Sequence, residues 1–543
     1  MFLRLQEGLK KHSVKTNSSW AEAYRVMSGE LAGPWRFENF PWLKDMHDAT
    51  EEECVGQKAA QMGYSETMLN ICLAKIDMYQ VSCLYVLPTK TPDASDFSAS
   101  RFDPALELSP YLANLFTDVK NVGMKRAGAA SLFVRGSKSR VGLKSIPVGH
   151  IILDELDEMD QHNIALAMER TSGHLSRQTW MVSTPTMENF GINFYFNRSS
   201  QDHYFFKCPS CSRHIELLFP DNIKITADDP YDPKISESYI FCKLCGATLD
   251  HNAKPDLFKS ATWEPSVLGR NIHGFYINQL YSTKISPATF ATKFLFAQTN
   301  PTEEQEFFNS NLGMPHVVDG AKLSEATIDA CIGDYTNYDT YKGSKLVTMG
   351  VDVGKWLHYI IYEWSLNSTI KTTDISNLST PRVLCISKCV DFEDLDILMQ
   401  RYKVHQCVID ANPETRKALE FARRFWGRVR LCYFGNHVRG KTIYTPKDIE
   451  SAVTVDRTSW LDLALSRFHN KKITLPKDKP LEFNAHLTAI SRCYEKDRDG
   501  NPVGRYLTGK NKPDHYALAC NYAEIALPIA AGLISNRDIT EPI

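Results

Sequence analysis

The amino-acid sequence predicts an α/β protein built around parallel sheets. The apolar, largely β-branched run Ile151–Leu153 has the composition of a strand buried on both faces. Two adjacent carboxylates, Asp154 and Glu155, follow it at the end where open α/β sheets bind ligands. Two C-x-x-C pairs lie downstream, and short apolar runs in the C-terminal half carry or end on aspartate. These observations predict two α/β domains and a small metal-binding insertion.

The composition is that of an ordinary globular chain. Its 543 residues allow for about two to four domains, and 43% are hydrophobic and 23% charged. We find no apolar run of about 18 residues and no secretory signal, so no membrane span is expected. Outside the two C-x-x-C pairs the cysteines are scattered, which is typical of reduced thiols in a cytosol plus one metal site. With a net charge of −2, a polyanion would have to bind local basic patches.

The acidic pair at the end of the central strand is typical of an ATPase. Asp154 would hold Mg²⁺, and Glu155 would orient or deprotonate the attacking water. The alternative is a strand that ends in a solvated acidic turn, which Asp157, Glu158 and Asp160 continue. The ATPase interpretation requires a phosphate-binding loop upstream.

A variant of the phosphate-binding pattern G-x-x-x-x-G-K-[ST] lies upstream and precedes a helical run. Gly63 and Ser65 occupy the last glycine and the hydroxyl positions. Tyr64 stands where lysine is usual, and Lys58 takes the first position instead. The sequence therefore predicts an ATP-binding loop whose cation lies at its entrance.

Three further features belong to the same predicted domain. The aromatic stretch from Phe40 to Leu43 could stack on adenine, although packing in the core is the more common role of such rings. Arg101 could reach the nucleotide of a neighbouring subunit as an arginine finger, and its alternative is a surface ion pair. The strand from residue 178 ends in Ser183 and Thr184, at the usual place of a sensor for the γ-phosphate.

Lys58 with Gly63–Ser65, the run Ile152–Glu155 and the run Ser183–Pro185 together resemble the large terminase subunit of tailed bacteriophages, of the lambda type. In that family the phosphate-loop lysine is likewise displaced to the start of the motif. The resemblance implies a P-loop ATPase of the RecA/ASCE-like class that drives the packaging of double-stranded DNA. It also implies a nuclease further along the chain.

Thirty residues separate the two C-x-x-C pairs. Each pair presents two thiolates from a tight turn, and two such knuckles complete a tetrahedral zinc site. A redox dithiol is the alternative, but neither pair has a thioredoxin-like context. The predicted zinc ligands are Cys208, Cys211, Cys242 and Cys245. The resemblance to lambda-type terminases implies a zinc-ribbon-like insertion here, with a return to the ATPase core at Trp263 and His273–Asn278.

Three aspartates in the C-terminal half fit a ribonuclease-H-like nuclease. Asp352 lies near the end of a first strand, Asp410 ends a fourth, and Asp514 opens a late helix. In two-metal phosphodiester cleavage, Mg²⁺ or Mn²⁺ ions about 3.5–4 Å apart stabilise the attacking and leaving oxygens. The alternative for each aspartate alone is a helix cap or a turn. Terminase nuclease domains resemble this arrangement, which implies metal-binding roles for these three aspartates.

Other polar residues of this half have two interpretations. Asp456 is expected to cap a helix rather than to join the metals. A second group could hold DNA phosphates beside the acids, with solvated loop charge as the alternative; it comprises Asn436, His437, Arg439, Lys441, Lys510 and Lys512.

The predicted organisation places six segments in order along the chain. They are an N-terminal helical segment (1–32), the P-loop ATPase core (33–200), the zinc-binding insertion (201–255), an ATPase return and linker (256–340), the nuclease (341–527) and a tail (528–543). Residues 280–340 are expected to be helical and polar and to link the halves.

The predicted activity is ATP-driven translocation of double-stranded DNA into a procapsid, with cutting of concatemeric DNA. The resemblance implies ATP, Mg²⁺ or Mn²⁺ and Zn²⁺ as cofactors, and a small terminase subunit, the capsid portal and a homo-oligomeric ring as partners, in the host cytoplasm. One alternative is a host helicase-like or transposase-like ATPase and nuclease. A helicase should carry a second RecA-like core, of which residues 340–525 show no motif. A non-catalytic DNA-binding scaffold is the other alternative.

Overall fold

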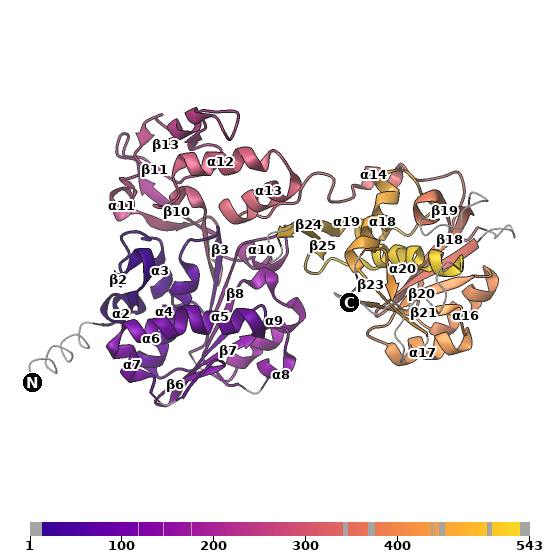
Figure 1. Cartoon of the computed structure of the whole chain (residues 1–543), viewed down its shortest axis with the longest axis horizontal. Helices are drawn as coiled ribbons and strands as arrows, with labels where there is room; N and C mark the ends of the chain where they lie inside the picture. The colour runs from indigo at the N-terminus through magenta and orange to yellow at the C-terminus, as the bar shows by residue number, and fades with distance from the viewer. Residues whose placement is uncertain are drawn as a thin grey trace, which may run out of the picture. The chain divides into compact units, whose positions relative to one another are not determined.

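The chain is described by a computed structural model in which two compact units are distinguished (Figure 1). One unit comprises the chain up to His316 together with Tyr494–Lys496, and the other comprises the remainder. The described residues are 14–117, 119–144, 146–174, 176–339, 346–366, 375–435, 438, 440–444, 451–496 and 502–532. Within them, no helix combines the length and the apolar content that a membrane span needs. The predicted domain boundaries stay predictions.

The N-terminal unit is built on one large sheet whose central strands are parallel. In spatial order its strands are β11 (His214–Ile215), β10 (Asp202–Lys207), β16 (Ile272–Ile277), β3 (Glu53–Lys58), β9 (Gln178–Ser183), β8 (His150–Asp154), β4 (Cys83–Leu87), β7 (Ala130–Gly136), β6 (Met124–Ala127) and β5 (Val119–Asn121), with β15 (Thr262–Pro265) beside β10. β3, β9 and β8 are neighbours, so their carboxyl ends lie together at one edge.

Helices cover both faces of this sheet because each central strand is apolar on both sides. Ile152 of β8 packs in the cluster that contains α4 (Tyr64–Tyr79), whereas its neighbours Ile151 and Leu153 pack in the cluster on the other face. α2 (Asn17–Tyr24) and α3 (Leu43–Asp48) lie against α4, while α9 (Gln161–Met168) and α10 (Gly191–Phe196) cover the opposite face. The sequence pattern of a doubly covered strand therefore corresponds to the structure.

The N-terminal segment is less helical than the sequence predicts. α2 ends at Tyr24, and β1 (Val26–Met27) pairs with β2 (Gly33–Pro34) in a small antiparallel ribbon. The helix therefore ends well before Gly33-Pro34, the predicted break. Thr16 caps α2 by accepting a hydrogen bond from the Ser19 N–H group.

An insertion follows β10 and carries a separate three-stranded antiparallel sheet. Its strands are β12 (Ile223–Lys224), β13 (Tyr239–Phe241) and β14 (Thr248–Leu249). After the insertion, β16 rejoins the large sheet beside β3 in parallel register, with Ile277 opposite Lys58. The chain from β10 to β14 is thus bracketed by two strands of the large sheet.

The region from 280 to 316 is not a simple polar linker, and in this respect the prediction is wrong. α12 (Pro287–Ala297), α13 (Pro301–Glu306) and the π-helical turn Phe307–Asn311 pack together. Phe290, Phe294 and Phe307 form a ring cluster with Phe219 of the insertion, at centroid separations of 4.8–5.9 Å. Burial of these rings fixes the segment to the N-terminal unit.

The C-terminal unit is built on a second, mixed sheet. Its strands, in spatial order, are β19 (Ser379–Cys389), β18 (Leu357–Leu366), β17 (Leu346–Val353), β20 (Gln406–Asp410), β21 (Val429–Phe434), β23 (Ala452–Val455) and β22 (Ile443–Tyr444). The first three are antiparallel to one another, and β17, β20, β21 and β23 are parallel. This is the strand arrangement expected of the ribonuclease-H-like class.

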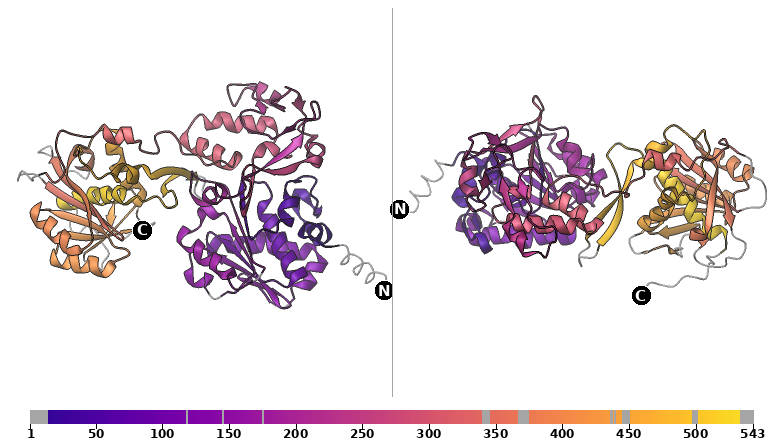
Figure 2. Two further views of the ribbon diagram at one scale, coloured as in Figure 1. Left: turned by 180° about the vertical axis from the view of Figure 1, so that it is seen from behind. Right: turned by 90° about the horizontal axis from the view of Figure 1, so that it is seen from above.

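Side chains of β17 alternate between the two faces of that sheet. Met349 and Val351 pack with α16 (Phe392–Arg401) and α17 (Thr415–Arg424) on one face. Gly350 faces α20 (His515–Ala530) on the other, and Asp352 shares that face because it lies two residues further along the strand. The views of Figure 2 show α20, in yellow, beside the orange strands of this sheet.

Gly350 allows α20 to approach the sheet closely. A Cβ atom at this position would lie 2.0 Å from the Ala519 carbonyl oxygen and 2.3 Å from the Ala523 nitrogen, both backbone atoms of α20. The helix runs to Ala530, past residue 528 where the sequence predicts a tail, because Ile525 and Leu527 are buried.

Candidate ATPase and nuclease centres

The predicted phosphate loop joins β3 to α4 at the carboxyl edge of the large sheet. Lys58 is the last residue of β3, and only 5% of its surface is exposed. Its Nζ atom lies 3.1 Å from Oε1 of Glu155, at the end of the acidic strand. The first-position lysine and the acidic pair, 97 residues apart in the chain, therefore meet at one edge.

The loop is held from outside by residues that sequence patterns did not indicate. The N–H groups of Ala59 and Ala60 donate to the carbonyls of Ile277 (2.9 Å) and Ser310 (2.7 Å). The Gln279 side chain donates to the Ala60 carbonyl at 2.9 Å, and the Trp42 indole to that of Met62 at 3.1 Å. Because most of these contacts use backbone groups from distant segments, no local motif could have revealed them.

Asp154 is buried at the end of β8, and its two carboxylate oxygens have different surroundings. The Tyr85 hydroxyl donates to Oδ2 at 2.6 Å. Oδ1 is buried and has no hydrogen-bond partner within the described residues. Burial raises the pKa of this carboxyl and the charge of Glu155 adds to the rise, whereas Lys58 opposes it. A carboxylate with one free buried oxygen beside the Ser65 hydroxyl fits a site for Mg²⁺ or its water ligands.

Glu155 adopts a left-handed backbone conformation, with φ of 60°. Such a conformation is uncommon for a residue with a Cβ atom and is found most often at functional sites. It turns the chain immediately after the strand, while the Glu155 N–H group still donates to the Val182 carbonyl of β9 at 2.9 Å. The side chain thereby points to Lys58 and remains partly exposed.

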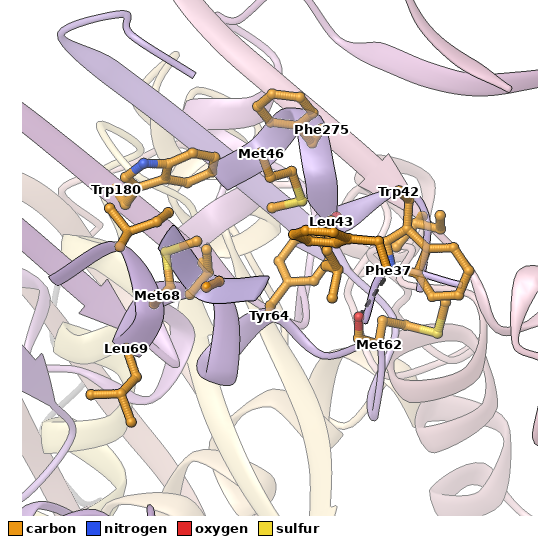
Figure 3. Packing of buried hydrophobic residues seen from close by; sticks show 14 of the residues in the cluster. Phe37, Trp42, Leu43, Met46, Met62, Tyr64, Met68, Leu69, Trp180 and Phe275 are labelled. Atoms are coloured by element: carbon orange, nitrogen blue, oxygen red, sulfur yellow. Dashed lines mark hydrogen bonds between the residues drawn. The ribbon is translucent and has the colours of Figure 1, made fainter. Parts of the chain in front are cut away.

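Tyr64 does not face the nucleotide site with its side chain. Only 1% of the residue is exposed, and its ring packs among Leu43, Met68, Trp180 and Phe275 in the core beneath β3 (Figure 3). Its contribution to nucleotide binding is therefore limited to its backbone at the start of α4. Tyrosine replaces the usual lysine here because this position of the helix points into the core.

Gly56 provides the space for that ring. A Cβ atom at Gly56 would lie 2.5 Å from Cε1 of Tyr64 and 3.0 Å from Val182. We expect Gly56→Ala to lower the free energy of unfolding of the N-terminal unit by about 1–3 kcal/mol, because the overpacked ring has to shift. Denaturant unfolding followed by Trp fluorescence measures this. Gly173→Ala is the matched control, since its added Cβ would meet no atom within 4 Å. Equal stability of the two variants would contradict the packing argument.

A cavity of about 670 Å³ opens at the loop. Its lining includes Lys58, Ser65, Glu155 and Thr184, together with the whole loop from Ala60 to Glu66. On another side it is bordered by Trp35 and Phe40. Trp42 is completely buried, so within the predicted aromatic stretch Phe40 is the ring available to a bound base. The cavity thus combines a cation, a carboxylate and helix N–H groups with an aromatic side, as a nucleoside triphosphate requires.

The strand that ends in Ser183 and Thr184 is hydrogen-bonded to the turn after the acidic pair. Ser183 Oγ accepts from the Asp157 N–H group at 3.2 Å. The Asp157 carboxylate accepts in turn from the N–H groups of Thr186 and Ile192, both at 2.7 Å. Burial raises the pKa of Asp157 to about 7. Asp157 is therefore a buried link between the acidic turn and the following segment, and not part of a solvated acidic turn.

Arg101 lies at the edge of the same cavity, in its own chain. It pairs with Glu66 of α4 at 2.8 Å, and Glu66 also pairs with the buried Arg25 at 2.5 Å. The ion pair that the sequence left as the alternative is thus present. The Arg101 side chain remains 42% exposed toward the cavity region.

The four predicted zinc ligands meet in the insertion. Their sulfur atoms all lie within 4.8 Å of one another, with Cys208 and Cys245 3.9 Å apart and Cys211 and Cys242 4.0 Å apart. The two pairs have the same backbone pattern. The first cysteine of each accepts from the N–H group four residues later and donates to the carbonyl five residues later. Hydrogen bonds from Arg213 lower the pKa of Cys211 to about 6, which favours the thiolate that a metal binds.

The three aspartates of the C-terminal unit lie at the end of the sheet that α20 approaches. Asp352 is buried on β17, Asp410 ends β20, and Asp514 precedes α20. Burial raises the pKa of Asp410 to about 6, and the charge of Asp352 adds to the rise. Burial also raises the pKa of Asp352, as does the charge of Asp514. Carboxylates that destabilise each other's ionised form in this way fit a site for divalent cations.

Histidines surround Asp352, and the sequence interpretation missed them. The Nδ1 atom of His515 lies 2.8 Å from Asp352 Oδ2. The His358 and His515 rings stack with centroids 4.5 Å apart and an interplanar angle of 10°, and His486 lies 5.5 Å from both. Burial lowers the pKa of His358 to about 3 and that of His486 to about 4, so both are neutral imidazoles. The register of β17 and β18 sets Asp352 opposite His358, which sequence separation alone does not show.

The remaining predicted residues divide into three groups. Asp456 caps α18 (Arg457–His469) by accepting from the Thr458 N–H group at 3.0 Å, so the cap is confirmed. Lys441, Lys510 and Lys512 are described, and any contact of theirs with DNA stays a prediction. The other candidates for DNA contact, Asn436, His437 and Arg439, lie outside the described residues.

The fold and the two centres define an ATPase joined to a ribonuclease-H-like nuclease. Two family models match the chain: the ATPase domain of the phage terminase large subunit gpA over residues 29–263, and the endonuclease domain of the same subunit over residues 272–537. The chain therefore belongs to the gpA family of phage terminase large subunits. It has the ATPase and endonuclease activities of that family, and it uses nucleotide and divalent metal ions.

A solved structure agrees with this fold over nearly the whole chain. The large terminase of bacteriophage HK97 is similar with a TM-score of 0.51 and 12% identity, over 95% of this chain and 99% of that one. The large terminase of a thermophilic bacteriophage gives 0.32 and 9% over 90% and 98%, and the ATPase domain of the Thermus phage P74-26 large terminase gives 0.32 and 11% over 51% and 96%. No curated protein sequence matches the chain.

Proposed function

We propose that the chain is the motor and nuclease of a viral packaging machine, which moves double-stranded DNA into a procapsid and cuts concatemeric DNA into genome lengths. The observation that carries the proposal is the meeting of Lys58, Glu155 and Thr184 around one cavity at the edge of a parallel sheet. Membership of the gpA family supports it, because the same chain carries the endonuclease domain. A host helicase-like or transposase-like enzyme and a non-catalytic scaffold are not favoured by either family model.

In the ATPase centre each residue has a distinct task. Lys58 would leave its pair with Glu155 to neutralise phosphate charge, and the N–H groups of Gly63, Tyr64 and Ser65 at the start of α4 would cradle the phosphates. Asp154, through its free Oδ1, and the Ser65 hydroxyl would hold Mg²⁺. ATP with Mg²⁺ supplies the phosphoanhydride bond that is cleaved.

Glu155, released from Lys58, would orient the attacking water and accept its proton. Ser183 would pass the resulting shift of the acidic turn to the segment behind it, since its hydroxyl is bonded to Asp157, and Thr184 borders the phosphate site. Arg101 would reach phosphate when its pair with Glu66 opens, within its own subunit or across to a neighbouring one.

In the nuclease centre we propose that Asp352, Asp410 and Asp514 hold divalent cations. The buried carboxylates would position a water molecule and the scissile phosphate between those cations, which stabilise the attacking and leaving oxygens. Thr508 fixes Asp514 by donating to its Oδ2 at 2.7 Å. The described lysines Lys441, Lys510 and Lys512 would contact DNA phosphates.

We further propose that Cys208, Cys211, Cys242 and Cys245 bind one Zn²⁺ that stabilises the insertion and takes no part in chemistry. We expect Cys242→Ser to lose about one Zn²⁺ per chain in elemental analysis and to lower the unfolding temperature, because the small three-stranded sheet depends on the ion. Cys389→Ser, far from these four in the sequence, is the control and should keep its zinc. Full zinc content in Cys242→Ser would contradict the assignment.

The proposed partners are double-stranded DNA, a small terminase subunit and the portal of the procapsid, with a homo-oligomeric ring forming during packaging in the host cytoplasm. The experiment that tests the whole proposal is plasmid digestion by the full chain with and without ATP, Mg²⁺ and Mn²⁺, with phosphate release measured in the same samples. We expect metal-dependent cutting and ATP hydrolysis. A chain that does neither, yet binds DNA, would support the scaffold instead.

A further inference from the structure

The nuclease centre contains a second type of ligand that the three aspartates do not explain. One ligand atom each from Asp352, His358 and His515 lie within 4.8 Å of one another. Among the described residues of this unit, Asp410 and Asp514 do not belong to that group. The group joins three separate elements, namely β17, β18 and the start of α20.

The fold brings these side chains together for clear reasons. Asp352 and His358 are directly opposite each other in the antiparallel pair β17–β18, so their side chains emerge on the same face. Gly350 lets α20 approach that face, and the first residue of α20 is His515. His486 of α19 (Phe483–Thr488) packs its ring 5.5 Å from each of the two other histidines.

The distances suit the inner ligands of one ion. Asp352 Oδ2 and His515 Nδ1 are 2.8 Å apart, close to the roughly 3 Å that separates two ligands at right angles around an ion with bonds of about 2.1 Å. His358 Nδ1 is buried and has no hydrogen-bond partner within the described part of the chain. A buried, unpartnered nitrogen beside a carboxylate is costly unless a donor or a cation satisfies it.

We propose that Asp352, His358 and His515 bind a divalent transition-metal ion such as Mn²⁺, Co²⁺ or Zn²⁺ in the nuclease centre. The ion replaces the proton between His515 and Asp352, which is released to water, and a turn of the His358 ring completes the third bond. Imidazole nitrogen is a ligand for these ions, whereas Mg²⁺ prefers oxygen, so the site discriminates against Mg²⁺. The inference rests on the proposed nuclease centre, since it states the metal chemistry of that same site.

The test uses Mn²⁺ as the probe on the full chain without nucleotide. Pulsed electron paramagnetic resonance detects ¹⁴N coupling when a histidine nitrogen is bonded to Mn²⁺, and ¹⁵N-histidine labelling should shift that signal. We expect the coupling in the unmodified chain, a clear decrease in His358→Gln and in His515→Gln, and its loss in the double variant. His469→Gln, an exposed histidine at the end of α18, is the matched control and should retain the full signal.

Mn²⁺ bound without nitrogen coupling, coupling that survives in the double variant, or no bound Mn²⁺ would each overturn the proposal. Far-ultraviolet circular dichroism and thermal unfolding of the variants verify that the C-terminal unit is folded. Plasmid cutting by the same samples keeps the two proposals apart. Nitrogen-coupled Mn²⁺ without cutting contradicts the nuclease role of these residues, whereas cutting with oxygen-bound Mn²⁺ alone contradicts only the histidine site.

Discussion

Replacing Glu155 with glutamine is expected to reduce ATP turnover by about 10³-fold while ATP still binds. A general base contributes roughly 10²–10⁴-fold to a rate, and glutamine keeps the shape of the side chain but cannot accept the proton. The loss of the 3.1 Å pair between Glu155 and Lys58 should leave the lysine free for phosphate, so affinity should be equal or higher. Steady-state phosphate release and binding of a fluorescent ATP analogue measure the two effects separately.

Two control variants make this result specific. Glu188→Gln, on an exposed residue near the same strand end, should hydrolyse ATP at the unmodified rate. Lys58→Ala should instead lose nucleotide binding, because the buried cation that neutralises phosphate is gone. Normal turnover by Glu155→Gln would remove Glu155 as the base and direct attention to another carboxylate at the cavity.

The second large effect is expected in the other unit. We expect Asp352→Asn to reduce Mn²⁺-dependent plasmid cutting by roughly 10³-fold, because metal ions supply several kcal/mol of transition-state stabilisation and Asp352 interacts with both other aspartates. ATP hydrolysis should be unchanged, since that centre lies in the N-terminal unit. Gel analysis of supercoiled plasmid and phosphate release provide the measurements.

Asp396→Asn is the matched control for cutting. Asp396 pairs with Arg424 at 2.7 Å on the face of the sheet covered by α16 and α17, away from α20. It should cut plasmid at the unmodified rate. If Asp352→Asn cut equally well, the phosphodiester chemistry would have to be located elsewhere in the chain.

Strand-end chemistry was the part of the site that could be predicted from residues alone. Parallel strands place their carboxyl ends at one edge, so Lys58, Asp154 and Ser183, each at the end of an apolar strand, had to converge if the strands were neighbours. The cysteine pairs were equally informative, because their spacing limits the geometry of the two turns. In each case the local pattern carried its own spatial consequence.

Residues whose role depends on contacts between distant segments could not be found in this way. Gln279 and Ser310 hold the phosphate loop from more than 200 residues away, and Ser310 accepts through its backbone carbonyl, to which any residue type would be suited. Asp157 looked like solvated charge because burial by α10 is invisible in the sequence around it.

The order of apolar strands, displaced lysine, acidic pair, cysteine pairs and three aspartates is written in the sequence, and it determined the two α/β domains and the kinds of chemistry. Tertiary structure alone decided which way Tyr64 faces, that Arg101 pairs with Glu66, and that histidines from β18, α19 and α20 surround Asp352. The physical reason is that side-chain surroundings are set by register between strands and by how closely a helix can approach a sheet. A single glycine, Gly350, controls that approach, and its effect extends to a histidine 165 residues further along the chain.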